Sequence, residues 1–180
     1  MRKLIVSSFV SLDGVIESPM MWTSPFFDDE SKDYAYHQLA DVEFFLLGRV
    51  TYDAFSARWP QIRGDKYFDR INGLKKLVAS TTLRDVTWNA SVMTGDVAAT
   101  LRALKEQSGG TIMKYGLTQL DRTLLANKLV DEYNLWIVPT VVRQGKRAFE
   151  DVGTSLPKLD LVDVRRFTSG SAILRYSPRY

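Results

Sequence analysis

A short apolar run that ends at a glycine constrains this chain more than any other stretch. Residues 44–47 read Phe-Phe-Leu-Leu, Gly48 follows, and Arg49 and Thr51 stand at the start of a segment with helical character. A buried strand that turns through glycine into a helix leaves the first backbone N–H groups of that helix unpaired. The positive end of the helix dipole lies there too, so such a turn is a ready anion site. Arg49 and Thr51 add a guanidinium and a hydroxyl, and the alternative interpretation is an ordinary turn with a surface arginine.

The same passage from strand to helix recurs along the chain. Apolar runs predict strands at residues 3–10, 42–47, 74–79, 111–114 and 131–142, with a weaker signal around residues 87–93. The strand predicted at residues 131–142 contains Pro139, where a bulge or strand break is expected. Helical patterns between them begin near residues 28, 49, 63, 96 and 117. This alternation predicts a three-layer α/β fold whose sheet is mixed but mostly parallel. Residues 159–167 and 171–176 flank a Thr-Ser-Gly turn, which predicts a C-terminal antiparallel hairpin.

Composition excludes several classes of function. The length of 180 residues suits one domain, residues 1–180, and the formal charge of +3 has no basic stripe that would indicate nucleic acid. The chain has no cysteine and one histidine, His37, which argues against thiol chemistry, a zinc site or a Ser-His-Asp triad, so no metal is expected. We find no signal peptide and no apolar run of about 20 residues, and therefore expect a cytoplasmic protein without membrane contact.

Four predicted strand ends carry small or polar residues suited to ligand binding: residues 11–14, 48–51, 80–82 and 115–118. Ligands of α/β sheets bind outside the carboxyl ends of the strands. Several anion sites along one edge suit a long, multiply charged ligand such as a dinucleotide. The usual Gly-x-Gly-x-x-Gly fingerprint and the Walker phosphate loop are both absent.

Residues 15–27 form a predicted loop that is rich in large apolar side chains, including Trp22 and Phe26. A long irregular segment with this much apolar surface must cover something. It is either a satellite hydrophobic cluster or a lid over a flat ligand.

Four motifs in a fixed order carry a family resemblance: SLDGVI at residues 11–16, LLGRVTY at 46–52, LVDEY at 129–133 with Pro139 after it, and the segment 167–176. Together they resemble the dihydrofolate reductase superfamily over almost the whole chain. The likeness is closer to the reductase domain of bifunctional riboflavin-biosynthesis deaminase-reductases, and to their stand-alone bacterial relatives, than to true folate reductases. The resemblance implies a reductase that uses NADPH, and a homodimer.

The resemblance also implies roles for individual residues. The cofactor phosphates would bind at Gly48, Arg49 and Thr51. The adenosine ribose and its 2′-phosphate would lie near Ser80, Thr81 and Thr82, with Arg84 either assisting or facing solvent. The pyrophosphate and nicotinamide would pass over Tyr115, Gly116, Leu117 and Thr118. The substrate would be bordered by Asp13 and Gly14, with Trp22 and Phe26 as its apolar wall.

Two departures from the family pattern bear on activity. Relatives usually have a Gly-Gly pair where this chain has Tyr115-Gly116, which narrows the approach of backbone to pyrophosphate. Relatives also usually have a glycine-rich turn where residues 142–146 read Val-Arg-Gln-Gly-Lys in this chain. Separately, true folate reductases place a carboxylate on the helix after the loop, and Asp33 is the candidate here for a catalytic proton donor. The expected activity is hydride transfer to a small heterocyclic or carbonyl substrate, with the riboflavin-pathway aminouracil phosphate as one candidate. The alternative is a non-catalytic ligand-binding module that keeps the reductase fold.

Overall fold

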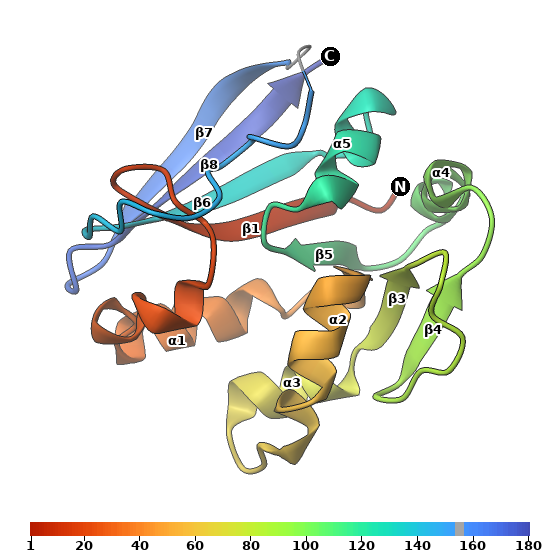
Figure 1. The fold of residues 1–180 in the computed structure, drawn as a ribbon, viewed down its shortest axis with the longest axis horizontal. Helices are drawn as coiled ribbons and strands as arrows, with labels where there is room; N and C mark the ends of the chain where they lie inside the picture. The colour runs from red at the N-terminus through yellow and green to blue at the C-terminus, as the bar shows by residue number, and fades with distance from the viewer. Residues whose placement is uncertain (154–156) are drawn as a thin grey trace. The chain divides into compact units, whose positions relative to one another are not determined.

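The computed structural model describes residues 1–153 and 157–180, and its strands belong to an eight-stranded mixed sheet within an α/β fold (Figure 1). Most strand pairs are parallel, and the C-terminal strands pair antiparallel, which confirms the predicted fold class. The chain divides into two compact units. Unit 1 comprises Met1–Leu4 and Asp33–Lys114, and unit 2 comprises Ile5–Lys32 and Tyr115–Tyr180. The assignment of residues 1–180 to a single domain stays a prediction.

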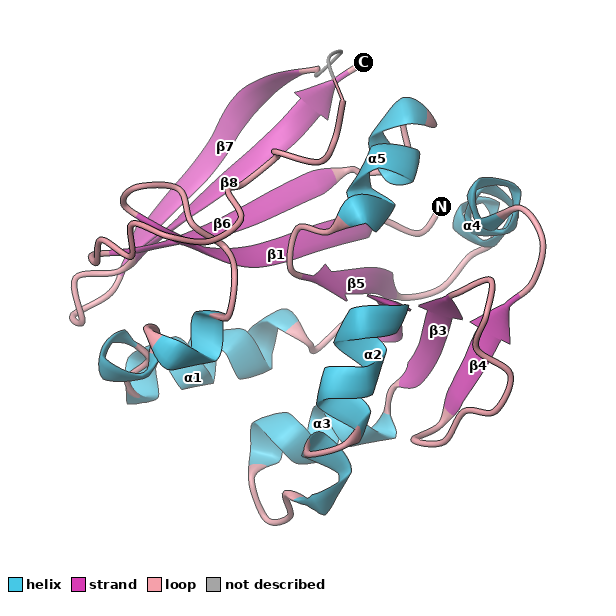
Figure 2. Cartoon of the chain, in the orientation of Figure 1, coloured by secondary structure: helices cyan, strands magenta, loops and turns pink. Residues whose placement is uncertain are grey.

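Unit 1 contains the strand order β4-β3-β2-β5, with all pairs parallel. Figure 2 shows β3 and β4 side by side in this unit. Its strands are β2 (Val42–Gly48), β3 (Lys75–Ala79), β4 (Ala90–Met93) and β5 (Thr111–Tyr115, whose last residue belongs to unit 2). Its helices are α1 (Asp29–Gln38, from Asp33 onward), α2 (Arg49–Ser56), α3 (Lys66–Gly73) and α4 (Val97–Glu106), with a 3-10 turn, η3, at Trp59–Gln61.

Side-chain caps set the start of two of these helices. The carboxylate of Asp65 accepts hydrogen bonds from the backbone N–H groups of Tyr67 and Phe68, at 2.9 and 3.2 Å. Helix α3 therefore begins at Lys66 and not at residue 63, where the charged segment starts. Asp96 caps α4 in the same way, through the N–H groups of Ala98 and Ala99, as the sequence predicts.

Aromatic packing fixes α2 against the sheet of unit 1. Phe45 of β2 is fully buried and stacks on Phe55 of α2 with ring centroids 6.4 Å apart. Phe55 stacks in turn on Trp59 at 3.8 Å. Trp59, three residues after the end of α2 at Ser56, thus packs against a ring of that helix.

A fully buried lysine, Lys76, closes the other end of α3. Its ammonium donates to the carbonyls of Ile71, Asn72 and Leu74 at 2.7–2.8 Å and lies 4.3 Å from the ring centroid of Trp88. Burial lowers the pKa of Lys76 to about 8. Because the three carbonyls lie at a helix C-terminus, the cation compensates the negative end of the helix dipole, and its role is structural.

Unit 2 contains the strand order β1-β6-β8-β7. Its strands are β1 (Leu4–Ser11, whose first residue belongs to unit 1), β6 (Glu132–Val138), β7 (Lys158–Arg166) and β8 (Ala172–Arg179). The helix α5 spans Gln119–Ala126, and 3-10 turns η1 and η2 lie at Pro19–Met21 and Ser24–Phe26. In Figure 1, β8 lies between β6 and β7. The predicted hairpin and the end of β6 before Pro139 are both confirmed.

Neither β6 nor β8 lies at a sheet edge of unit 2. β6 pairs with both β1 and β8, and β8 pairs with both β6 and β7, so the apolar alternation at residues 135–138 and 172–174 belongs to inner strands. Alternation cannot distinguish an inner antiparallel strand from an edge strand. The strand at the end of the order in unit 2 is β7, whose Leu161, Val162 and Val164 are 49–56% exposed.

Within the described residues, no helix is long and apolar enough to cross a membrane.

Candidate functional site

The first glycine turn lies at the N-terminus of α2 in unit 1. Gly48 has an extended backbone, with φ −80° and ψ 163°, and no side chain caps the helix. The first turn of α2 contains no acidic residue, and a Cβ placed on Gly48 would meet no atom within 4 Å. The backbone N–H groups of this helix start are therefore open to a ligand from the side of Gly48.

Arg49 and the predicted ribose-binding turn meet within unit 1. The guanidinium Nη1 of Arg49 donates to the hydroxyl of Thr82 at 2.6 Å. The hydroxyl of Ser80 accepts from the N–H groups of Thr82 and Leu83, at 3.3 and 3.0 Å, so Ser80 fixes the turn that holds Thr82. Three of the residues predicted to bind phosphate and ribose thus form one small cluster.

The remaining predicted residues of unit 1 differ in how far they are exposed to solvent. Thr81 and Arg84 are exposed and Thr51 is half-buried. Tyr52, which follows Thr51, is buried and its hydroxyl accepts from the backbone N–H of Thr87 at 2.8 Å. This contact ties α2 to the loop after residue 82 and supports the position of the Arg49 and Thr82 pair.

The second glycine turn, in unit 2, is closed by its own side chains. Gly116 has φ +75°, and its N–H donates to the carbonyl of Ser7 at 2.8 Å. The hydroxyl of Thr118 accepts from the N–H of Leu120 at 3.3 Å, and the carboxylate of Asp121 accepts from the N–H of Thr118 at 2.7 Å. This is a capping box. The Asp121 carboxylate thus satisfies the backbone N–H of Thr118 at this helix start.

Tyr115 and Leu117 flank Gly116 in this turn. Tyr115 is the last residue of β5 and is half-buried, whereas Leu117 is 7% exposed. The predicted helix from residue 117 starts two residues later, because Thr118 is its N-cap.

Asp13, predicted to border the substrate, joins two loops of unit 2. Its carboxylate accepts from the hydroxyl of Ser11 at 2.6 Å and from the N–H groups of Val142 and Arg143 at 3.1 and 2.7 Å. These hydrogen bonds, that of Ser11 first, lower the pKa of Asp13 to about 2. Its backbone carbonyl also accepts from the guanidinium of Arg147.

Gly14 extends this connection between the two loops. It has φ +85°, and its carbonyl accepts from the N–H of Ala148 at 2.8 Å. An ionised carboxylate with three internal donors is a poor proton donor and a strong loop anchor. Asp13 and Gly14 therefore hold the shape of this end of unit 2.

The apolar loop after β1 is only partly covered. Phe27 packs edge-on against Phe9 at 5.7 Å in a cluster with Trp136 and Phe167, whereas Met20 and Met21 are 69% and 84% exposed. Trp22 and Phe26 are half-buried, and the indole of Trp22 donates to the carbonyl of Glu17 at 2.9 Å. The loop thus forms part of a core cluster at its end, whereas the methionines at its tip are exposed.

Asp33, the candidate proton donor, lies on the surface of unit 1. Its carboxylate is 53% exposed and pairs with Lys66 at 2.5 Å, and it lies 3.4 Å from Nε2 of His37. The hydrogen bond from Lys66 lowers the pKa of Asp33. A general acid at neutral pH needs a raised pKa, so this environment does not favour that role.

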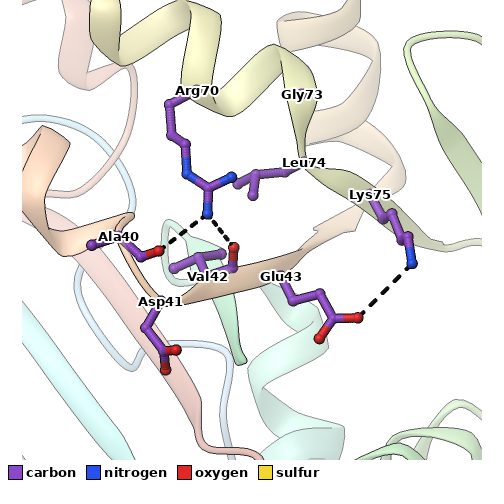
Figure 3. A pocket seen from close by; sticks show the side chains of 8 residues that line it. All are labelled: Ala40, Asp41, Val42, Glu43, Arg70, Gly73, Leu74 and Lys75. Carbon is purple, nitrogen blue, oxygen red and sulfur yellow. Dashed lines mark hydrogen bonds and ion pairs between the residues drawn. The ribbon is translucent and has the colours of Figure 1, made fainter. Parts of the chain in front are cut away.

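A separate hollow of about 320 Å³ lies in unit 1 (Figure 3). Arg70 donates to the carbonyls of Ala40 and Val42, and Lys75 lies 3.9 Å from Glu43. The hollow is at the amino ends of β2 and β3, whereas Gly48 is at the carboxyl end of β2. The charged side chains that line it already have partners within the protein, and it is not the predicted ligand site. It is lined by Ala40, Asp41, Val42, Glu43, Arg70, Gly73, Leu74 and Lys75.

The sequence analysis does not identify two contacts near the glycine turns, the capping box of α5 and the ion pair of Arg49 with Asp53, although both have recognisable residue spacings. The Thr118 to Asp121 spacing is a capping-box pattern. Asp53 lies one helical turn after Arg49, and its carboxylate is 3.5 Å from Nε of Arg49. The loop anchor at Asp13 has no such signal, because its partners are 129 and 130 residues away in the sequence. In the described residues, no group of three His, Cys, Asp or Glu side chains could hold a metal ion.

Comparison with known proteins identifies relatives over nearly the whole chain. The family model described as the RibD C-terminal domain matches residues 2–173. The uncharacterized protein YyaP of Bacillus subtilis is 28% identical over 182 residues, which cover 97% of this chain and 94% of YyaP.

Solved structures share the fold at low sequence identity. A protein of Shewanella sp. PV-4 named for riboflavin biosynthesis has a TM-score of 0.78 at 16% identity, with 99% of both chains covered. The diaminohydroxyphosphoribosylaminopyrimidine deaminase/5-amino-6-(5-phosphoribosylamino)uracil reductase of Thermotoga maritima has a TM-score of 0.69 at 14% identity. That match covers 99% of this chain and 57% of the Thermotoga chain.

Proposed function

Because the chain belongs to the RibD C-terminal domain family, we propose that it is an NADPH-dependent reductase that transfers a hydride to a small heterocyclic or carbonyl substrate. The observation that carries the proposal is the open N-terminus of α2. Of the two glycine turns, this one has no side-chain cap, no acidic residue in its first turn and a guanidinium beside it. Backbone N–H groups and a guanidinium fork are the donors that phosphate groups prefer.

The residues of unit 1 have clear tasks in this proposal. Gly48 lets a phosphate approach the helix N-terminus without a side chain in the way, and Arg49 binds the 2′-phosphate of the adenosine ribose. Thr82 holds the guanidinium in place, and Ser80 holds Thr82. Thr51 and Thr81 add hydroxyl donors near these groups.

The residues of unit 2 are proposed to act by shape and exclusion of water. Asp13 and Gly14 fix the loop that borders the substrate, and Trp22 and Phe26 supply apolar surface. Tyr115, Gly116, Leu117 and Thr118 supply the backbone along which the cofactor runs. The cofactor provides the hydride, and the protein orients the reactants and excludes water.

The name of one relative supplies the first substrates to test. The Thermotoga relative is named as a 5-amino-6-(5-phosphoribosylamino)uracil reductase, so phosphorylated aminouracils are the first substrates to test. Neutral pterins, quinones and simple carbonyls complete the panel, because members of one fold family can act on different acceptors.

Two measurements on the purified protein test the proposal. Titration with NADPH, followed by tryptophan fluorescence, is expected to show saturable binding below millimolar concentration. NADPH oxidation across the substrate panel is then expected to show turnover with at least one compound. Absence of NADPH binding at millimolar concentration would contradict the reductase.

A second candidate function is a ligand-binding module that keeps the fold without catalysis. The capping box of α5 favours it, because Asp121 occupies the N–H of Thr118 and Tyr115 replaces a glycine of the family pattern. Saturable NADPH binding without oxidation across the whole panel would favour this function over the reductase.

We also propose a homodimer that uses the exposed face of β7. A bulge at Val162 places Leu161 opposite Tyr176 and Val164 opposite Leu174, so these apolar side chains share one face of the strand pair. Sedimentation is expected to give a dimer at micromolar concentration, and a Leu161→Glu, Val164→Glu double variant is expected to give a folded monomer. A monomeric wild-type protein would contradict the dimer.

A further inference from the structure

Arg49 has a carboxylate partner one turn along its own helix. The Oδ2 atom of Asp53 lies 3.5 Å from Nε of Arg49, and the two side chains are 52% and 54% exposed. Nη1 of Arg49 donates to Thr82 at 2.6 Å. The contact with Thr82 is a hydrogen bond and uses one of the five N–H donors of a guanidinium, whereas the contact with Asp53 is an ion pair. The guanidinium is therefore held in place with donors left for a ligand.

The two side chains have opposite preferences for an adenosine ribose. An arginine accommodates the 2′-phosphate of NADP, whereas an aspartate or glutamate accepts a hydrogen bond from the 2′-hydroxyl of NAD. Here one helical turn supplies both groups within ion-pair distance of each other. A 2′-phosphate that binds Arg49 must also meet the negative charge of Asp53, and a ribose hydroxyl avoids that repulsion.

We infer that Asp53 weakens the preference of this site for 2′-phosphorylated cofactors, so that the protein binds NADH as well as NADPH. The inference rests on the proposed function, since it concerns the cofactor bound at Arg49. Asp53 is a specificity-determining residue in this scheme. It lowers the positive potential of Arg49 without removing the arginine.

The expected effect is modest, because both side chains are about half exposed and water screens their interaction. Removal of the Asp53 charge is expected to raise the ratio of NADPH affinity to NADH affinity about threefold to tenfold. Thr82 still holds the guanidinium in such a variant.

The test compares Asp53→Asn with a matched control, Asp69→Asn. Asp69 is an exposed aspartate on α3 of the same unit, so its substitution removes the same charge from another helix. Dissociation constants for NADPH and NADH are measured by fluorescence titration, and those for adenosine 2′,5′-bisphosphate and AMP by calorimetry. In Asp53→Asn we expect tighter NADPH and bisphosphate binding with unchanged or weaker NADH and AMP binding. The control is expected to leave both ratios unchanged.

The outcomes separate this inference from the proposed function. If wild type binds neither NADPH nor NADH at millimolar concentration, the reductase proposal fails and the inference falls with it. If wild type binds NADPH but Asp53→Asn leaves the ratio unchanged, the inference is wrong and the reductase proposal stands. If Asp53→Asn weakens NADPH selectively, Asp53 orients Arg49 for the phosphate, and the inference is again overturned.

Discussion

The two glycine turns look alike in the sequence and differ in how their backbone donors are used. In both, an apolar strand meets glycine and a helix follows. At the turn in unit 2, Asp121 accepts from the N–H of Thr118, and the helix start is satisfied from within the chain. At the turn in unit 1, α2 has no side-chain cap, and its first residue is Arg49.

The difference has an energetic meaning. A cation at a helix N-terminus opposes the helix dipole, and an uncapped N-terminus forgoes about 1 kcal/mol of stability. The helix start in unit 2 has a side-chain cap and no cation as its first residue. A second carboxylate in this unit, that of Asp13, accepts hydrogen bonds from two more backbone N–H groups. The start of α2 thus lacks the side-chain cap found at α3, α4 and α5. This difference supports the proposal that α2 binds a phosphate group.

Substitution of Arg49 by alanine is expected to give the largest effect. Loss of charged hydrogen bonds to a phosphate costs about 1.5–3 kcal/mol, so NADPH binding is expected to weaken about 10- to 100-fold. NADH binding is expected to change much less. Fluorescence titration with both cofactors measures the split, and Arg49→Lys, which keeps the charge and loses the fork, is expected to lie between. Equal losses of affinity for NADPH and NADH would mean that Arg49 does not bind the 2′-phosphate and contacts a phosphate that both cofactors share.

Alanine at the two glycines is expected to give opposite results. At Gly48 the backbone is extended and a Cβ has open space, so Gly48→Ala is expected to cost less than about 1 kcal/mol of stability. The methyl group would lie in the path of a phosphate, and cofactor binding is expected to weaken about tenfold, the loss of roughly one charged hydrogen bond.

At Gly116 an alanine is expected to affect stability more than it does at Gly48. Its φ of +75° suits glycine, and Gly116→Ala is expected to cost about 1–2 kcal/mol of stability. Thermal melts of both variants, beside NADPH titrations, provide the comparison. A Gly116→Ala protein as stable as wild type, or a Gly48→Ala protein that binds NADPH unchanged, would remove the distinction between the turns.

Much of this architecture was accessible from the sequence, because it depends on local patterns. The strands and helices follow from apolar runs and from caps such as Asp96. The position of the hairpin was predicted, but the outer position of β7 was not, because pairing order depends on contacts between distant residues. The Gly48 and Arg49 turn was a candidate from its residue types alone. Its difference from the second turn depends on where Asp121 and Thr82 point, which only the folded chain shows.

Removal of the Asp121 carboxylate tests the closed turn directly. Asp121 is fully buried, and Asp121→Ala leaves the N–H of Thr118 without its acceptor. We expect a loss of about 1 kcal/mol from the capping box and a drop in melting temperature of about 2–4 °C. Thr118→Ser, which keeps the hydroxyl, is the control and is expected to melt within about a degree of wild type. Weakened NADPH binding at unchanged stability would show that Asp121 serves the ligand site.

The smallest expected effect is a pH dependence at Asp13, the other carboxylate that satisfies backbone donors in unit 2. Its folded pKa of about 2 lies below the ordinary aspartate pKa of 3.8. Its contribution to stability is therefore complete above that value and is lost as pH falls toward 2. Urea unfolding of wild type and Asp13→Asn is expected to differ at neutral pH and to converge as the pH falls from about 4 to about 2. Ser11→Ala removes the hydrogen bond that lowers the pKa of Asp13 most. When Asp13→Asn is made in the Ser11→Ala background, the difference in the free energy of unfolding is therefore expected to vanish at a higher pH than it does in the wild-type background. A difference that persists unchanged down to pH 2 would mean that the carboxylate does not hold this loop through its charge.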